Sequence, residues 1–219
     1  MIYNIEANEF FRHPMQVNKV RIEGVYNLLE GDIPEVVFNH AHLEIPKGKM
    51  SVTGSWRFDP HSDNGIVDIN ANVSRLELSQ LANYLPKTID ADALDWLEKA
   101  FLQGYAENAE ISVKGVVDHI PFGEHASSGD FRIKGDVRDV QLHYHQFPAR
   151  ENTYWPDIYV KEGTIDFNRG NILIKGPQLS FNPELALSKL ATNDAQVEVN
   201  NIEKNTKVLI KTGIETNGD

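Results

Sequence analysis

The chain has 219 residues, of which 41% are hydrophobic, and a formal net charge of −11. Because this acidic chain has no cluster of Lys and Arg, we expect it to bind neither nucleic acid nor, by simple adsorption, an anionic lipid surface. It contains no cysteine, which excludes disulfides and thiolate metal sites. Its apolar runs are short, so the sequence predicts no signal peptide and no transmembrane helix within these residues.

Residues 1–75 alternate between apolar and polar side chains, which is typical of β-strands with one apolar face. The clearest run contains Val52, Trp56 and Phe58, and Asn64-Gly65 downstream is a hairpin signal. This region is predicted to form the N-terminal strands of a sheet. A strand pattern begins directly after Met1, which favours an internal piece of a longer chain over a complete small protein.

Residues 76–104 form the one helical stretch of the sequence. Leu94, Leu97 and Phe101 recur at helical spacing and make an apolar stripe, and Gly104 stands where a glycine can end a helix. Pro86 separates a shorter first helix from the second. Since the stripe must be buried and the rest of the chain reads as strands, we predict a helical plug or lid on the sheet.

Residues 105–219 return to the strand pattern as the C-terminal strands of the same sheet. Strand signals recur roughly every 8–12 residues, which predicts an antiparallel meander. Glycines near mid-strand, such as Gly54 and Gly115, indicate bends. The predicted fold is therefore mainly β: a many-stranded, antiparallel, strongly curved sheet with a short helical insertion at about 78–103.

Candidate catalytic and metal sites are weak in this sequence. His40 and His42, and likewise His143 and His145, share a face of a strand and could bind Zn²⁺ or Cu²⁺ if the pairs met, but solvent-facing histidines are the simpler interpretation. Carboxylates are numerous without forming a catalytic pattern. We therefore predict no enzyme activity, no metal site and no cofactor.

An ordered set of short motifs resembles the YhdP branch of the AsmA-like proteins, and it extends from about Leu76 to Phe181. The motifs are Tyr84-Leu85-Pro86, Leu94-Asp95-Trp96-Leu97, Ala100-Phe101-Leu102-Gln103-Gly104, Gly115, Ile120-Pro121-Phe122-Gly123, Gly129-Asp130-Phe131, Tyr144 and Trp155-Pro156-Asp157-Ile158. The flanking regions match only as generic strands. The resemblance implies a long periplasmic protein that is anchored in the inner membrane of Gram-negative bacteria and whose curved sheet forms an apolar groove. It further implies a bridge that carries phospholipid to the outer membrane.

We therefore expect this chain to be one segment of such a bridge, holding phospholipid acyl chains in an apolar β-groove and adjoining neighbouring groove segments. The expected lining residues are Val52, Trp56, Phe58, Ile111, Val113, Phe131, Ile133, Ile165, Phe167, Ile172 and Ile174, and the expected lid residues are Leu94, Leu97 and Phe101. One alternative is a structural or adhesive β-sandwich with a closed core that binds protein or glycan. Another is an outer-membrane assembly factor whose edge strands pair with client strands.

Overall fold

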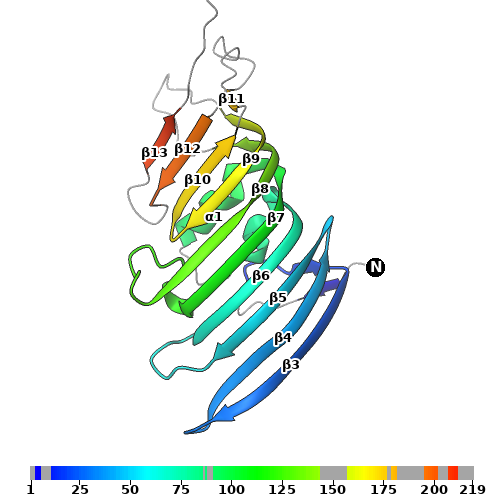
Figure 1. The fold of residues 1–219 in the computed structure, drawn as a ribbon, viewed down its shortest axis with the longest axis vertical. Coiled ribbons are helices and arrows are strands. Elements are labelled where there is room, and N and C mark those ends of the chain that lie inside the picture. The colour runs from blue at the N-terminus through cyan, green and yellow to red at the C-terminus, as the bar shows by residue number, and fades with distance from the viewer. Residues whose placement is uncertain are drawn as a thin grey trace, which may run out of the picture.

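The computed structural model describes residues 3–5, 11–85, 87, 91–143, 157–176, 179–181, 195–201 and 207–211. Most of these residues belong to one 11-stranded antiparallel sheet (Figure 1). Its strands are β3 (Lys19–Leu29), β4 (Ile33–Ile45), β5 (Gly48–Arg57), β6 (Ile66–Glu77), β7 (Phe101–Val116), β8 (Gly129–Leu142), β9 (Ile158–Asn168), β10 (Asn171–Gly176), β11 (Leu179–Phe181), β12 (Ala195–Asn200) and β13 (Lys207–Lys211). Two further short strands, β1 (Tyr3–Ile5) and β2 (Met15–Val17), pair with each other.

Strands that follow one another in the chain are mostly neighbours in the sheet. The order runs β13-β12-β10-β9-β8-β7-β6-β5-β4-β3, and β11 pairs with the beginning of β9. Within the described residues the sheet does not close, because β3 and β13 stand at its two ends. The prediction of a mainly-β, antiparallel, many-stranded sheet with a helical insertion is confirmed.

The helical insertion between β6 and β7 consists of a 3-10 helix, η1 (Leu78–Tyr84), and an α-helix, α1 (Ala91–Ala100). Both lie behind the sheet in Figure 1. The predicted helix end was wrong, because Phe101 begins β7 and pairs with Leu142 of β8. Gly104 lies inside β7 at φ +116°, where an added Cβ would come within 2.7 Å of Val140 Cα. This glycine therefore permits a close approach of two strands instead of ending a helix.

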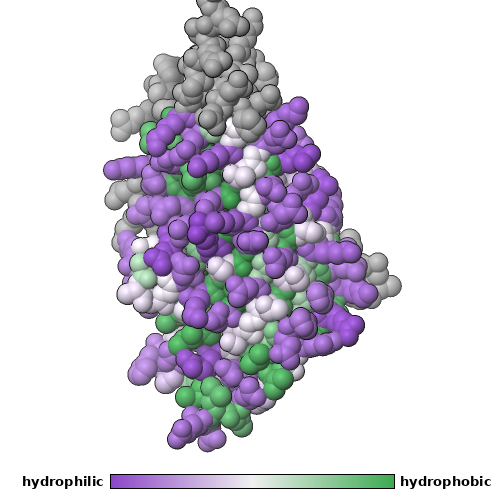
Figure 2. Space-filling model, in the orientation of Figure 1, coloured by the Kyte–Doolittle hydropathy of each residue, from purple (hydrophilic) through white to green (hydrophobic). Residues whose placement is uncertain are grey.

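One row of paired residues crosses almost the whole sheet and defines its apolar face. Residues that pair directly point to the same side, so a single row fixes the face of every strand that it crosses. We call it the transverse row; it consists of Ile22, Ala41, Val52, Ala71, Ile111, Ile133, Phe167, Ile172 and Val199. A second row on the opposite face is polar: Ser55, Asp68, Lys114 and Asp130. Figure 2 shows this side covered largely by hydrophilic side chains.

The strands are bent at bulges. The register shifts between Glu23 and Gly24 in β3 and between Phe38 and Ala41 in β4. A bulge bends its strand and increases the local twist. Gly24 lies at the first of these shifts.

Candidate apolar groove

The helices cover one half of the apolar face. Leu94, Leu97 and Ala100 of α1 and Leu78 of η1 are buried in one cluster with side chains of β7, β8, β9, β10 and β12. Apolar burial of this kind, at roughly 25 cal/mol per Å² of area removed from water, is what holds the helices on the sheet. We call η1 and α1 the lid and the part of the sheet beneath them the covered half of the groove.

Between the lid and the sheet a small cavity of about 70 Å³ remains. All of its lining residues are apolar; they include Leu78, Leu81 and Leu97 from the lid, Leu85 directly after η1, and Ile111, Ile133, Phe167 and Ile172 from the sheet. Pockets that hold small-molecule ligands measure about 300–1,000 Å³. In this state the lid therefore fills the covered half and leaves no room there for an acyl chain.

The lid does not cover the other half of the apolar face, on β3, β4 and β5; this half is exposed on β3, whereas Ala41 and Ile45 of β4 are buried. Ile22 of β3 belongs to the transverse row and has 58% of its surface exposed. Tyr26 and Leu28 point to the same side of β3, since they pair with Val36 and Pro34 of β4, and both are also exposed. Large apolar side chains exposed in one contiguous patch commonly mark a binding surface. We call this region the open half of the groove.

The predicted lining residues fall into three groups. Eight of them, all from β7 to β10, lie in or against the covered cluster: Ile111, Val113, Phe131, Ile133, Ile165, Phe167, Ile172 and Ile174. Val52 and Trp56 belong to the open half, where the Trp56 indole donates to Asn64 O at 2.8 Å. Phe58 lies beyond the end of β5 and is 43% exposed. The structure thus places ten of the eleven on one face of the sheet.

The predicted lid residues fall into two groups, one on the helix and one on a strand. Leu94 and Leu97 belong to α1 and are buried in the cluster between this helix and the sheet. Phe101, which the helical spacing placed in the lid, is instead a buried residue of β7 and belongs to the floor. The reason is that its backbone pairs with β8, which the pattern of a single segment does not reveal.

The loop between β7 and β8 closes one end of the covered half, a feature that the strand pattern did not indicate. Ile120 and Phe122 are buried in the same cluster as the lid, and Pro121 lines the cavity. Residues 117–119 form a short 3-10 helix, η2 (Val117–His119). The loop is thus a second insertion that meets the lid over the sheet.

Asp118 fastens this loop to the neighbouring β5–β6 loop. Its carboxylate accepts hydrogen bonds from Ser62 Oγ at 2.6 Å, Asn64 Nδ2 at 2.5 Å and the backbone N–H of Asp63 at 2.9 Å. Burial works against the charged form, yet these donors outweigh it and hold the pKa of Asp118 below its ordinary value. Asp118 is therefore a structural anion that ties two loops together at one end of the groove.

The family assignment follows from comparison with known proteins. A family model described as YhdP protein matches residues 3–219. The chain belongs to the YhdP family. No curated protein and no solved structure matched it. Membership of the YhdP family supports, in general terms, a part in bridge-like lipid transport by an AsmA-like protein.

The YhdP family is one of periplasm-spanning proteins anchored in the inner membrane. None of the helices in the described ranges has the length and apolar character that a membrane span requires.

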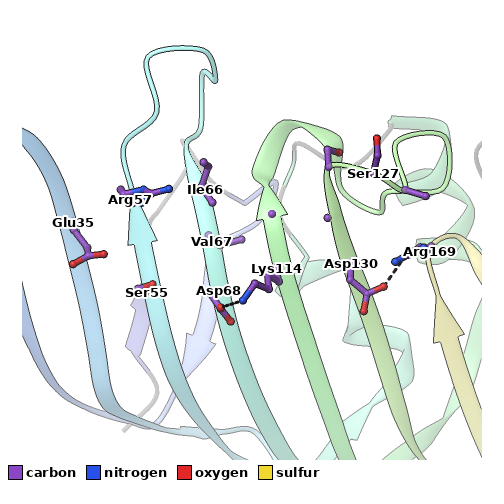
Figure 3. Close-up of a pocket in the computed structure, with 14 residues that line it drawn as sticks. Glu35, Ser55, Arg57, Ile66, Val67, Asp68, Lys114, Ser127, Asp130 and Arg169 are labelled. Carbon is purple, nitrogen blue, oxygen red and sulfur yellow. Dashed lines mark hydrogen bonds and ion pairs between the residues drawn. The ribbon is translucent and has the colours of Figure 1, made fainter. Parts of the chain in front are cut away.

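The polar face carries a hollow of about 580 Å³ at the strand ends (Figure 3). Its charges are largely paired: Lys114 lies 2.5 Å from Asp68, and Arg169 lies 2.7 Å from Asp130. These ion pairs connect neighbouring strands and the strand ends on the polar face of the sheet.

The histidines considered as metal ligands have different surroundings in this YhdP-family chain. His40 and His42 are exposed, with ring centroids 6.2 Å apart. His143 lies 2.7 Å from the carboxylate of Asp157, whereas His145 lies outside the described residues. Across the described ranges, no group of three or more potential metal ligands occurs.

Proposed function

We propose that this chain is one segment of a periplasmic bridge that holds phospholipid acyl chains in its apolar groove on their way to the outer membrane. The full-length protein would be anchored in the inner membrane. The observation that carries the proposal is the transverse apolar row, which runs from Ile22 of β3 to Val199 of β12 on one face of the sheet. Such a face offers acyl chains a continuous apolar surface.

The physical chemistry of the groove suits this role. An acyl chain needs apolar area and gains about 25 cal/mol for each Å² removed from water. It needs no acid–base pair, and the headgroup can stay in water above an open groove. The open half is the accessible part in this state, because Ile22, Tyr26 and Leu28 are exposed there. We therefore propose that an acyl chain first binds on β3 to β5.

Neighbouring segments of the full-length protein are the proposed partners of the sheet ends. β3 is an 11-residue strand at one end of the described sheet. A strand at a sheet edge presents a row of unpaired backbone groups that favours pairing with a further strand. Pairing of this kind would extend the groove and continue its apolar row.

A pair of substitutions on β3 provides the test. Ile22→Asp puts a charge on the lining face, whereas Val25→Asp puts the same charge on the opposite face, since Val25 pairs with Val37 on that side. The two side chains are similarly exposed, at 58% and 48%, so both variants should fold. Native mass spectrometry with lipid extraction, on protein purified without detergent, measures the bound phospholipid.

The proposal expects phospholipid at a fixed low stoichiometry on the wild-type chain and on Val25→Asp, and a clear loss on Ile22→Asp. Equal lipid on the two variants would contradict the assignment of the open half. A wild-type chain that stays lipid-free after incubation with phospholipid vesicles would favour a structural domain with a closed core. Binding of unfolded outer-membrane barrel proteins in place of lipid would favour an assembly factor.

A further inference from the structure

An N-terminal segment reaches across to the outer side of the lid. Arg12 Nη1 lies 2.5 Å from Asp95 Oδ1 of α1 and 3.7 Å from Glu98, and Arg12 Nη2 donates to Ala91 O at 3.2 Å. His13 Nε2 lies 3.4 Å from the same Glu98. One guanidinium thus contacts two carboxylates and a backbone carbonyl of a single helix. We call residues 11–17 the strap.

The other end of the strap is fixed to the sheet. Val17 is buried in a second apolar cluster with Ile45, Val73, Leu76 and Ala109. The next residue, Asn18, donates its backbone N–H to Glu44 O of β4 at 2.6 Å. Since one end is buried against the sheet and the other is ion-paired to α1, the strap joins the lid to the sheet from outside.

The way the lid is attached allows it to move as a unit. η1 follows β6 directly, and α1 runs directly into β7. β6 and β7 are paired at this point, through Leu76 with Ala106 and Glu77 with Tyr105. Both ends of the lid are therefore attached where β6 ends and β7 begins, at the same end of two paired strands. Hinge motions that use residues at the ends of elements need not disturb the strands themselves.

We propose that the strap is a latch that keeps the lid closed over the covered half, so that release of Arg12 from α1 admits acyl chains to that half. This inference rests on the proposed function, because it concerns access to the same groove. Arg12 also lowers the pKa of Asp95, chiefly through their hydrogen bond, which favours the charged carboxylate. The latch contact is exposed, and it should therefore weaken as salt concentration rises.

Charge reversal with rescue tests the latch without lipid. Arg12→Glu places a third acidic group beside Asp95 and Glu98, and adding Asp95→Arg to that variant restores an opposite-charge pair. The matched control is Arg21→Glu, which reverses the charge of another exposed Arg–Glu pair, 2.5 Å long, on β3. Amide hydrogen exchange by mass spectrometry then reports the opening of residues 94–100 in each chain.

The latch predicts that lid amides exchange about two- to five-fold faster in Arg12→Glu, the effect expected for an exposed ion pair. Amides of β8 and β9 should keep their wild-type rates, and the double variant should return the lid to the wild-type rate. Unchanged lid exchange in Arg12→Glu, equal acceleration in Arg21→Glu, or failure of the double variant to restore the rate would overturn it.

Lipid loading of the same variants separates this inference from the proposed function. The latch expects Arg12→Glu to take up more phospholipid from vesicles than the wild-type chain does. Faster lid exchange in a chain that never binds lipid would leave the latch standing and refute the lipid groove. Normal lipid binding with unaltered lid exchange would refute the latch and leave the groove standing.

Discussion

The ring of Phe122 lies against the backbone of Gly129. A Cβ added to Gly129 would come within 2.3 Å of Phe122 Cε1, so the absence of a side chain there makes room for the ring. Phe122 is fully buried, although it comes from the loop between two long strands. The loop is therefore part of the core, and it closes the covered half of the groove opposite the lid.

Replacing Phe122 with alanine should cost about 3–5 kcal/mol of unfolding free energy, because it removes a buried aromatic ring and leaves a cavity. Phe58→Ala is the matched control, since that ring is 43% exposed and should cost less than about 1 kcal/mol. Urea unfolding monitored by circular dichroism measures both. Similar losses for the two variants would show that the β7–β8 loop does not contribute to the core.

Leu97→Ala should enlarge the cavity beneath the lid. The side chain is buried and lines the existing space of about 70 Å³, so its truncation should cost about 2–5 kcal/mol and create a dry apolar cavity. We expect this variant to bind xenon or benzene, which NMR titration detects. Leu102→Ala, at a side chain that is 50% exposed, should bind neither; binding by both variants would place the site elsewhere.

Local periodicity was enough to find the apolar face of most strands. Alternation puts Ile133 and Phe167 each on the apolar face of its own strand, and the two residues pair directly in the structure. The method failed where a residue's role depends on a distant partner. The local sequence around Gly104 is compatible both with the end of a helix and with a close approach of two strands. Only the pairing of β7 with β8 decides between the two.

Other parts of the site had no local signal at all. The register shift between Phe38 and Ala41 shifts the alternation of β4, which hides the fact that Val36 and Ala41 share a face although they are five residues apart. The contact of Arg12 with Asp95 spans 83 residues of sequence. Contacts of this kind arise only when the whole sheet has brought the two segments together.

Gly54→Ala should destabilise the sheet strongly. Gly54 has φ +138°, and an added Cβ would come within 2.0 Å of Asp68 O on the neighbouring strand. Backbone strain and crowding each cost about 1–3 kcal/mol, so the loss should exceed about 2 kcal/mol. Thr53→Ala, at an exposed neighbour in the same strand, should stay within about 1 kcal/mol in the same urea titration. Equal effects would argue against close packing of β5 on β6 at this point.

Asp118 should make the end of the groove sensitive to acid. Its pKa in the folded state lies below the reference value of 3.8, so folding favours the charged carboxylate. Its contribution to stability is therefore complete above about pH 4 and is lost as the pH falls through the folded-state pKa. Asp118→Asn should cost about 1–3 kcal/mol at pH 7, because hydrogen bonds to a charged group are replaced by weaker ones.

The same argument predicts that this difference between wild type and Asp118→Asn shrinks steadily below about pH 4, where the wild-type carboxylate becomes protonated. Urea unfolding at a series of pH values measures it. Ser62→Ala removes the 2.6 Å donor to Asp118 and should raise the carboxyl pKa, which moves the loss of stability to a higher pH. A difference that stays constant from pH 7 to pH 3 would mean that the charge of Asp118 does not hold the two loops together.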